Sequence, residues 1–429
     1  MPTPQVPTNQ VTLDGLRQRI YERLPAELNT EKMREFAGGL AEVQLASVGK
    51  LQELVAQKPG SDTTAASAGT TTTLLSALGK KMAGVPSNVI TTVAGMPQAL
   101  IDNAGSMIIN LPTTITSNVL KEPPQGWCAP SEENLKEVQL MMRYAGASYC
   151  WRDDKLVDWS CPKHCKDFPT TKVVGVFSTT LEGGRGFVAL VDGLPKANGR
   201  VALVSIRGTV NLRGWAHNFM MAHASYKVPD HLADPDDKEE PRVHDGFQKH
   251  IVDAIEEHVV RLLKIAFDVP EGERPTQVYV VGHSLGGATA VLTAIDLLHR
   301  ELPWMPKQPV RVFTYGEPRV GNRAFARLVH RLCHKKLLEV IRVTNEGDPV
   351  PCVPLRSMGF HHHSNRWMLI PAGPGAMSEG KTYYDKNMST LNSKDKNAIE
   401  EGQDIGIWHP LADPLAHLIC WNRWFGPFC

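Results

Sequence analysis

Apolar and polar positions follow two different periods along residues 126–429. Short, mainly apolar runs alternate with longer stretches in which apolar positions recur at spacings of three and four. The short runs are typical of buried strands, and the longer stretches are typical of amphipathic helices. Strands are expected at 171–178, 187–192, 201–206, 278–281, 310–315 and 340–344, and helices at 131–147, 246–266 and 288–302. This alternation predicts an α/β fold with a central, mostly parallel sheet flanked by helices.

The first 125 residues show a different pattern and contain no constellation of catalytic side chains. An amphipathic helix is expected over 31–56, followed by a Gly/Ser/Thr-rich linker at 58–73. A second tract with helical spacing, within 85–120, is interrupted by two prolines. We expect residues 1–125 to form a helical extension of the main domain at 126–429. A removable pro-segment and a membrane-surface helix are the alternatives.

A strand-to-helix turn holds the first candidate for chemistry, Ser284. It is flanked by Gly282, His283 and Gly286, and it follows the strand at 278–281. A serine in such a sharp turn has its hydroxyl lifted clear of the sheet, near the amides of a helix N-terminus. Glycines suit the flanking positions because a side chain there would collide with the neighbouring strand or helix. The pattern predicts a nucleophilic serine, whereas a purely structural turn is the plainer interpretation.

A nucleophilic serine needs a base to take its proton and an acid to orient that base. In a fold of this order the acid follows the nucleophile, at the end of a later strand. Asp348 lies just past the strand at 340–344 and directly before Pro349, where the chain must turn. We expect Asp348 to be the acid in preference to Glu346, because its shorter side chain is better fixed.

The base must be one of the histidines downstream of Asp348. Three adjacent histidines, His361 to His363, follow it closely, and His409 and His417 lie further along the chain. The adjacent histidines are expected to be solvated or locally hydrogen-bonded, because a metal site would need further ligands. Spacing alone leaves His409 and His417 equal candidates for the base.

The tetrahedral intermediate of ester hydrolysis also needs hydrogen-bond donors for its oxyanion. The amide of Leu285, next to the nucleophile, is one candidate. A second is Thr209, since the strand at 201–206 runs into Arg-Gly-Thr and offers both an amide and a hydroxyl. The plain alternative for Thr209 is a turn at the end of a strand.

Apolar residues downstream of Thr209 share one face of an expected helix at about 210–223. Core packing is one interpretation of this face. A lid is the other: closed, it covers the site, and at an oil–water interface it opens and exposes a lipid-binding patch. The residues on this face include Leu212, Trp215, Phe219 and Met220.

Composition narrows the class of protein. The 46 basic and 45 acidic residues nearly cancel, which argues against nucleic acid as a partner. No apolar run is long enough for a transmembrane helix, and no secretory signal is visible at the N-terminus. The eight cysteines nevertheless favour an oxidising compartment. Cys161 and Cys165 are expected to close a small disulfide loop in preference to starting a zinc knuckle.

Taken together, residues 138–429 resemble the class 3 (fungal-type) triacylglycerol lipases, a family with the α/β-hydrolase fold. The order and spacing of the shared motifs are highly specific. The motifs are Ser148-Tyr149-Cys150 with Cys161 and Cys165, Arg207-Gly208-Thr209, Val243-His244-x-Gly246-Phe247, Gly282-His283-Ser284-Leu285-Gly286-Gly287, Gly316-x-Pro318-Arg319-Val320-Gly321-Asn322 and Asp348-Pro349-Val350-Pro351.

The resemblance implies several assignments that the residues alone leave open. The family's base stands near the C-terminus before a hydrophobic run, which matches His417. In the family the residue after Arg-Gly supplies the oxyanion hole, here Thr209, and the following helix is the lid. The resemblance also implies a Cys150–Cys429 disulfide, a Cys161–Cys165 disulfide and a pro-segment at 1–125. The acidic insert at 230–240 departs from the family's pattern and is expected to affect the lid or substrate access.

The function that follows as an expectation is a serine-triad carboxylic-ester hydrolase without a cofactor, foremost a triacylglycerol lipase. Its partner would be a lipid ester at a lipid–water interface, with peripheral membrane contact through the lid or residues 85–120. Phospholipase A1, diacylglycerol lipase and feruloyl esterase are alternatives within the family, and a catalytically silent lipid-binding protein is the alternative outside the enzymes. Secretion is favoured from the cysteines, and a cytoplasmic or lipid-associated location is the alternative.

Overall fold

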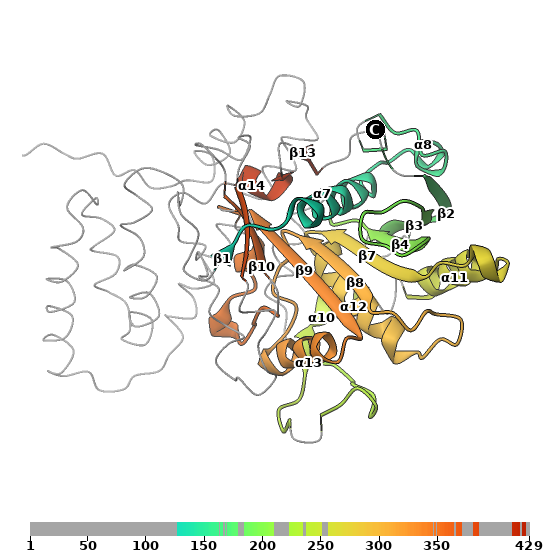
Figure 1. Ribbon diagram of the computed structural model, residues 1–429. Coiled ribbons are helices and arrows are strands. Elements are labelled where there is room, and N and C mark those ends of the chain that lie inside the picture. Colours follow the sequence, from blue (N-terminus) through green and yellow to red (C-terminus); the bar gives the residue numbers. More distant parts are fainter. Residues whose placement is uncertain are drawn as a thin grey trace, which may run out of the picture.

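A nine-stranded mixed sheet forms the centre of the molecule in this computed structural model (Figure 1). Its strands run in the order β1-β11-β10-β9-β8-β7-β4-β3-β2. Neighbouring strands from β4 through β10 are parallel, and the other pairs are antiparallel. The strands are β1 (Trp127–Cys128), β2 (Thr171–Ser178), β3 (Arg185–Val191), β4 (Val201–Ile206), β7 (Gln277–His283), β8 (Val310–Tyr315), β9 (Leu338–Asn345), β10 (Arg366–Ile370) and β11 (Lys381–Asp385).

The structure describes the main domain with gaps and none of residues 1–126. The described residues are 127–162, 164–165, 168, 170–178, 184–209, 223–234, 237–250, 256–345, 347–348, 350–363, 366–370, 381–385, 414–420 and 423–425. The helix expected at 31–56, the linker at 58–73 and the tract within 85–120 therefore lie outside the described part. So do Leu212, Trp215, Phe219 and Met220, which were expected to belong to a lid, and Cys429.

Helices cover both faces of the sheet. Figure 1 shows α7 on one side and α11, α12 and α13 on the other. Two small hairpins complete the described elements, β5 (His223–Ser225) with β6 (Arg242–His244) and β12 (Ile419–Cys420) with β13 (Arg423–Trp424). The helices are α7 (Glu132–Ala147), α8 (Asp153–Val157), α10 (Asp245–His250), α11 (Glu256–Phe267), α12 (Leu285–His299), α13 (Arg323–His334) and α14 (Pro414–Leu418), with short 3-10 turns at Glu271–Glu273, Val350–Cys352 and Arg356–Met358.

Burial on both faces explains why the central strands are apolar without alternation. In β7, Val278 and Val280 pack in a core that includes α12, whereas Tyr279 and Val281 pack in a second core that includes α7. A strand buried in this way has no solvated face that would call for polar residues. The strands expected at 171–178, 201–206 and 310–315 have those bounds in the structure.

The expected helices differ from the observed ones at their ends. The helix at 131–147 begins one residue later, because Ser131 is its N-cap and its side chain accepts a hydrogen bond from the amide of Asn134 (3.3 Å). The helix after Ser284 begins at Leu285, three residues before the expected start. Residues 246–266 were expected to form one helix, and the structure describes two helices there, α10 and α11, on either side of residues 251–255.

The parallel strands β4, β7, β8 and β9 end in register at one edge of the sheet. Ile206 lies opposite Gly282, His283 opposite Tyr315, and Tyr315 opposite Val343. The carboxyl ends of parallel strands form the edge where open α/β sheets bind ligands. The turn holding Ser284, the loop holding Thr209 and the turn holding Asp348 therefore all leave the sheet at this edge.

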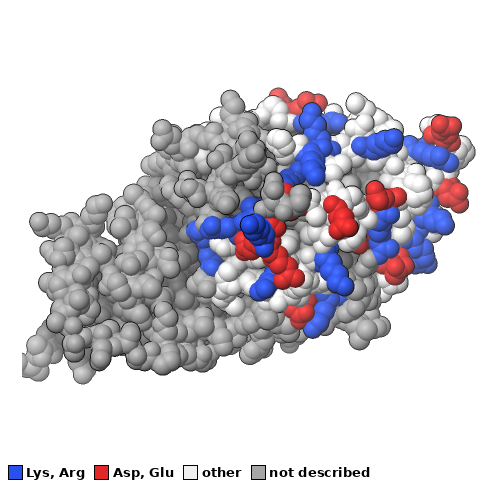
Figure 2. Space-filling view, turned by 90° about the horizontal axis from the view of Figure 1, so that it is seen from below, with Lys and Arg blue, Asp and Glu red and all other residues white. Residues whose placement is uncertain are grey.

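The acidic insert at 230–240 is anchored to α13. Asp237 accepts hydrogen bonds from Arg327 (2.6 Å) and Arg331 (3.1 Å), and Glu239 also accepts one from Arg327. Burial alone would raise the pKa of Asp237, but the hydrogen bonds and charges of the two arginines outweigh it and hold that pKa below its usual value. Elsewhere, as Figure 2 shows for one face of the molecule, basic and acidic side chains are interspersed.

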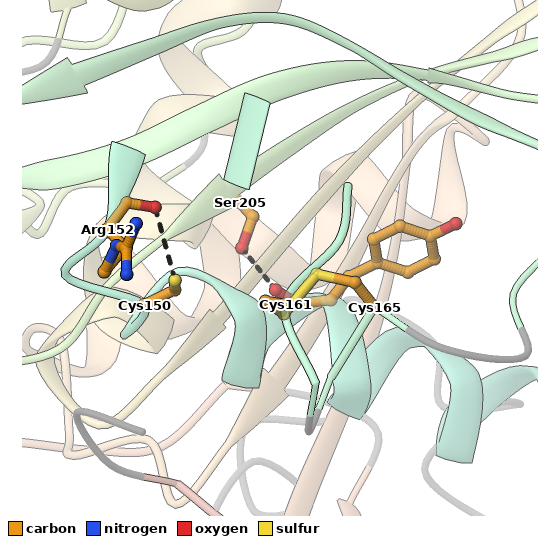
Figure 3. Close-up of a disulfide and its surroundings, with 6 residues drawn as sticks. Cys150, Arg152, Cys161, Cys165 and Ser205 are labelled. Carbon is orange, nitrogen blue, oxygen red and sulfur yellow. Dashed lines mark hydrogen bonds between the residues drawn. A yellow bond between two sulfur atoms is a disulfide. The ribbon is translucent and has the colours of Figure 1, made fainter. Parts of the chain in front are cut away.

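A disulfide joins Cys161 and Cys165 in the segment between α8 and β2 (Figure 3). Their Cα atoms are 5.1 Å apart, and both residues are buried. Cys150, in the same small cluster, is also disulfide-bonded. The Cys150–Cys429 pairing stays a prediction, because Cys429 lies outside the described residues. Within the described part, Cys128, Cys333 and Cys352 form no disulfide.

Candidate active site

Ser284 stands between β7 and α12 in a backbone conformation that residues other than glycine seldom adopt. Its φ is 58° and its ψ is −128°. A non-glycine residue in such a region costs roughly 1–3 kcal/mol, so the surrounding structure must impose it. The amide of Ser284 donates to the carbonyl of Tyr315 (2.8 Å), and its side chain makes no capping hydrogen bond to α12. The hydroxyl therefore does not stabilise the turn, and it remains available for another interaction.

The flanking glycines are required by close packing, as the sequence pattern suggested. A Cβ on Gly282 would clash with the backbone carbonyl of Gly286 in the first turn of α12. A Cβ on Gly286 would clash with the backbone carbonyl of Ile206 at the end of β4. Both obstacles are backbone atoms, which cannot rotate away as a side chain can. Only glycine at these two positions lets the helix start directly on top of the sheet.

The structure brings Asp348 and His417 together at the same edge. His417 Nδ1 lies 2.9 Å from Asp348 Oδ2, and both side chains are almost fully buried. The other carboxylate oxygen of Asp348 accepts a hydrogen bond from the amide of Val350 (2.9 Å), which fixes the rotamer of the carboxylate. An ionised carboxylate can only accept, so Nδ1 carries the proton and Nε2 of a neutral His417 has a free lone pair.

Ser284 lies in the same neighbourhood as this pair. Tyr315, which accepts from the amide of Ser284, is followed by Gly316, and a Cβ on Gly316 would come within 2.8 Å of both His417 Nδ1 and Asp348 Oδ2. Within the described part of the chain, Ser284 Oγ and His417 Nε2 are buried and have no hydrogen-bond partner. An unpaired buried polar atom costs about 1–3 kcal/mol. Such a cost at two neighbouring groups is typical of a reactive site that tightens only with substrate.

The loop after β4 lies directly against Ser284. A Cβ on Gly208 would stand 2.6 Å from the carbonyl oxygen of His283 and 3.0 Å from Ser284 Cβ. Thr209 follows in this loop and is partly exposed. Leu285 is the first residue of α12, where backbone amides have no acceptor within the helix. The candidate oxyanion donors thus lie next to Ser284 in sequence, for Leu285, and next to Gly208 in the adjoining loop, for Thr209.

The other candidates for acid and base are either engaged elsewhere or not described. His363 is bonded to Glu317 (2.7 Å) with both side chains fully buried, and His362 Nε2 donates to the carbonyl of Pro351 (2.6 Å). Both histidines are therefore hydrogen-bonded, but to partners 46 and 11 residues away in the chain, and the expectation of solvation is wrong for the buried His363. Glu346 and His409 lie outside the described residues.

Two residues at the site, His283 and Tyr149, make contacts that the sequence did not predict. His283 was singled out only as part of the turn, and Tyr149 only as part of a motif. In the structure Tyr149 Oη lies 2.7 Å from His283 Nδ1, and His283 Nε2 lies 2.8 Å from the carbonyl oxygen of His417. Each of these contacts joins residues 134 positions apart, so no local pattern could have indicated them.

The described residues show neither a metal site nor a membrane-spanning helix. No group of three or more His, Cys, Asp or Glu residues is arranged to hold a metal ion in that part of the chain. No helix among the described residues has both the length and the apolar character needed to cross a membrane. The expected lid at about 210–223 cannot be compared with the structure, because it lies in the part that is not described.

Comparison with known proteins identifies relatives of this chain. Residues 203–358 match the family model described as "Lipase (class 3)". A secreted mono- and diacylglycerol lipase 1 from Fusarium solani is 32% identical over 295 residues, which cover 67% of this chain and 75% of that protein. A lipase from Rhizomucor miehei is 27% identical over 246 residues, covering 57% of this chain and 61% of that protein.

Solved structures show the same fold. A Rhizomucor miehei lipase in complex with its propeptide, a deletion mutant, aligns with a TM-score of 0.53 at 25% identity, over 72% of this chain and 85% of that one. The native form of the same complex aligns with the same TM-score at 24% identity. The mostly parallel sheet flanked by helices is thus the α/β-hydrolase fold.

Proposed function

The chain belongs to the class 3 lipase family, whose members are serine hydrolases, and on that premise we propose that it hydrolyses lipid esters with a Ser284–His417–Asp348 triad. The observation that carries the assignment is the buried Asp348–His417 pair, which leaves Nε2 of His417 unpaired close to the strained turn of Ser284. An oriented imidazole beside a serine of this geometry activates the hydroxyl as a nucleophile.

In the first half of the reaction His417 Nε2 takes the proton of Ser284 Oγ as this oxygen attacks the ester carbonyl carbon. Asp348 stabilises the imidazolium through the hydrogen bond from Nδ1. The tetrahedral intermediate collapses when the bond to the alcohol oxygen breaks and His417 returns its proton to that oxygen. The products of this half are a free alcohol and an acyl ester on Ser284.

The second half repeats the sequence with water. His417 takes a proton from a water molecule, the hydroxide attacks the acyl carbon, and Ser284 leaves with the proton from His417. The fatty acid departs as a carboxylate once its proton is lost to solvent, and the enzyme returns to its starting state. In both halves we propose that Thr209 and the amide of Leu285 donate to the oxyanion. One such donor is worth about a hundredfold to a thousandfold in rate.

For the substrate, we propose a glyceride ester, with triacylglycerol first. The relative from Fusarium solani is named a mono- and diacylglycerol lipase, so partial glycerides are the second candidate. A phospholipase A1-IIbeta of Arabidopsis thaliana is 32% identical over 187 residues, which keeps phospholipid as a further one. Feruloyl esters are retained as a comparison substrate for the same triad.

Access to Ser284 requires movement, since the residue is only 1% exposed. This burial supports the proposal that residues 210–223 act as a lid that opens at a lipid–water interface. Peripheral membrane contact would then run through the lid or residues 85–120. The Cys161–Cys165 disulfide and the secreted Fusarium relative support secretion of this chain.

The test is a pair of serine variants assayed on a substrate panel. Ser284→Ala should abolish hydrolysis of a short-chain nitrophenyl ester and labelling by a fluorophosphonate. The control Ser131→Ala removes a serine oxygen at the N-cap of α7 and should keep both. Hydrolysis by Ser284→Ala at the wild-type rate would show the mechanism to be wrong. Emulsified long-chain triacylglycerol, tributyrin, diacylglycerol, phospholipid and methyl ferulate would then rank the substrates of the wild-type protein.

A further inference from the structure

Two buried hydrogen bonds run in series from Tyr149, which packs against the loop after β4, to the backbone of His417. The carbonyl of His417 can only accept, so His283 Nε2 donates to it (2.8 Å). A neutral imidazole with its proton on Nε2 has an acceptor at Nδ1, so the Tyr149 hydroxyl donates there (2.7 Å). The Tyr149 oxygen in turn lies against Gly208, where an added Cβ would come within 2.4 Å of it. In this series of hydrogen bonds each donor has one acceptor, and the carbonyl at its end fixes the direction of every bond.

The imidazole of His283 stays neutral. Burial, and then the neighbouring His417, hold the pKa of His283 well below its usual value. A neutral His283 keeps the proton arrangement described above, and it adds no positive charge to oppose the imidazolium that forms on His417 during catalysis. His283 is completely buried, and Tyr149 is 1% exposed.

The segment that carries His417 is joined to the sheet edge by hydrogen bonds and ring contacts, in addition to the burial of Ala416 and Leu418 in the core. Asn345 at the end of β9 donates to the carbonyl of Ala416 (3.1 Å), and His283 donates to the next carbonyl, that of His417. Phe425 stacks on the His283 ring at a centroid distance of 3.8 Å and an angle of 11°, and its amide donates to Leu418 (2.7 Å). His283 thus contacts this segment in two ways, by a hydrogen bond and by ring stacking.

We propose that His283 and Tyr149 are positioning residues, which fix the backbone of His417 and the Gly208 loop in one geometry relative to Ser284. The proposal rests on the assignment of Ser284 and His417 to the triad. Neither residue touches the reacting atoms. They hold the base and the oxyanion loop in fixed positions relative to each other. One conformation can then support both proton transfer and oxyanion binding.

Geometry of this kind has a large effect on rate. A misplacement of a catalytic group by about 1 Å can lower the rate by about a hundredfold. Ordinary core packing would make a different demand, because an apolar ring of equal size could fill the same space. The two roles therefore separate when the polar atoms are removed and the ring shape is kept.

The experiment compares four variants with the wild type. Tyr149→Phe removes the hydroxyl and keeps the ring. His283→Phe removes both polar atoms of the ring, whereas His283→Gln retains a donor that can reach the carbonyl of His417. The matched control is Tyr144→Phe. Tyr144 lies in α7 and is also buried, and its hydroxyl is hydrogen-bonded to Thr171 (2.7 Å), away from the site.

Four quantities are measured for each variant: the rate of fluorophosphonate labelling of Ser284, kcat and KM for a soluble nitrophenyl ester, and the melting temperature. Tyr149→Phe and His283→Phe should slow labelling and lower kcat about tenfold to a hundredfold, with KM nearly unchanged. His283→Gln should recover part of that loss. Tyr144→Phe should lower the melting temperature and leave the labelling rate at the wild-type value.

The outcomes separate this proposal from the proposed function. If the wild type is not labelled at Ser284, the triad itself is wrong. If the wild type is labelled and Ser284→Ala is not, but Tyr149→Phe and His283→Phe react at the wild-type rate, the positioning role is wrong. A rate loss in Tyr144→Phe as large as that in Tyr149→Phe would also overturn it, because stability alone would then explain the effect. Should His283→Phe fail to fold, Tyr149→Phe and His283→Gln still decide.

Discussion

Asp348 Oδ2 and His417 Nδ1 lie 2.9 Å apart although 69 residues separate them in the chain. Asp348 comes from the turn after β9 and His417 from α14, near the end of the described chain. Asn345 and His283, at the ends of two central strands, donate hydrogen bonds to consecutive carbonyls of the α14 segment and help to hold it at this edge. The hydrogen bond to Asp348 fixes the tautomer of His417 and leaves its Nε2 as an acceptor.

Asp348→Asn is expected to lower kcat about a thousandfold to ten-thousandfold with little change in fold. An asparagine amide can donate to Nδ1, which would move the imidazole proton to Nε2 and leave Ser284 without an acceptor. The measurement is kcat on a soluble ester, with the circular dichroism spectrum as a check on folding. A variant that keeps more than a tenth of the wild-type kcat would show that Asp348 does not set the tautomer.

Gly282→Ala is expected to destabilise the protein by about 1–3 kcal/mol or more, because the new methyl group meets the backbone of Gly286. The measurement is denaturant unfolding, read as a shift of the midpoint. Gly272 is the matched control, since a Cβ at that position would have nothing within 4 Å. Gly272→Ala should change the free energy of unfolding by no more than about 0.5 kcal/mol. Equal midpoints for the two variants would contradict the packing argument.

Asp237→Asn is expected to destabilise the protein at neutral pH by roughly 1–3 kcal/mol, since it weakens hydrogen bonds to two arginine side chains. The pKa of Asp237 is lower in the folded state than in the unfolded chain, so its contribution to stability is complete above the unfolded pKa and disappears as pH falls through the folded pKa. The difference in melting temperature between the variant and the wild type should therefore shrink in acid.

The control for that series is Asp158→Asn, which changes an exposed aspartate at the end of α8. Its melting temperature should follow the wild type at every pH. A gap between Asp237→Asn and the wild type that stays constant, or widens, as pH falls from neutral into acid would mean that the Asp237 cluster does not lower the pKa of its carboxylate.

Replacing Cys161 and Cys165 together by alanine is expected to cost about 2 kcal/mol in a chain-entropy model, because the disulfide closes a short loop. The measurement is the melting temperature with and without a reducing agent. Cys128→Ala is the control, since Cys128 is a free cysteine. The Cys128 variant should keep the wild-type sensitivity to reductant, whereas the double variant should lose part of it.

Sequence alone predicted the parts of the fold in which local pattern and burial agree. The strands at 201–206 and 310–315 are mainly apolar because every residue in them is buried. The strand at 171–178 is mostly half-buried and contains a valine-rich run. The strands β10 and β11 were not expected, because their place in the sheet depends on pairing with β9 and with each other. Such pairing depends on the folded chain, so a short segment carries only a weak sequence signal for it.

At the candidate active site, too, local features could be predicted from the sequence and long-range contacts could not. The turn around Ser284 is a local structure, and the glycine positions required by backbone contacts were visible in the sequence. The choice between His409 and His417 was not, because it depends on which of them reaches Asp348 across 69 residues. Resemblance to a family pointed to His417, and the structure supplies the contact. The bonds of Tyr149 and His283 were beyond both approaches, since their partners are set by the folded backbone.

The backbone of Ser284 carries one more consequence, for protein engineering. Its φ of 58° is one that glycine adopts without strain, and its buried hydroxyl forms no hydrogen bond among the described residues. Ser284→Gly would remove both costs, so this variant should be more heat-resistant than the parent and inactive. A library selected for thermal tolerance alone would therefore enrich the dead enzyme, and any such selection should include turnover from its first round.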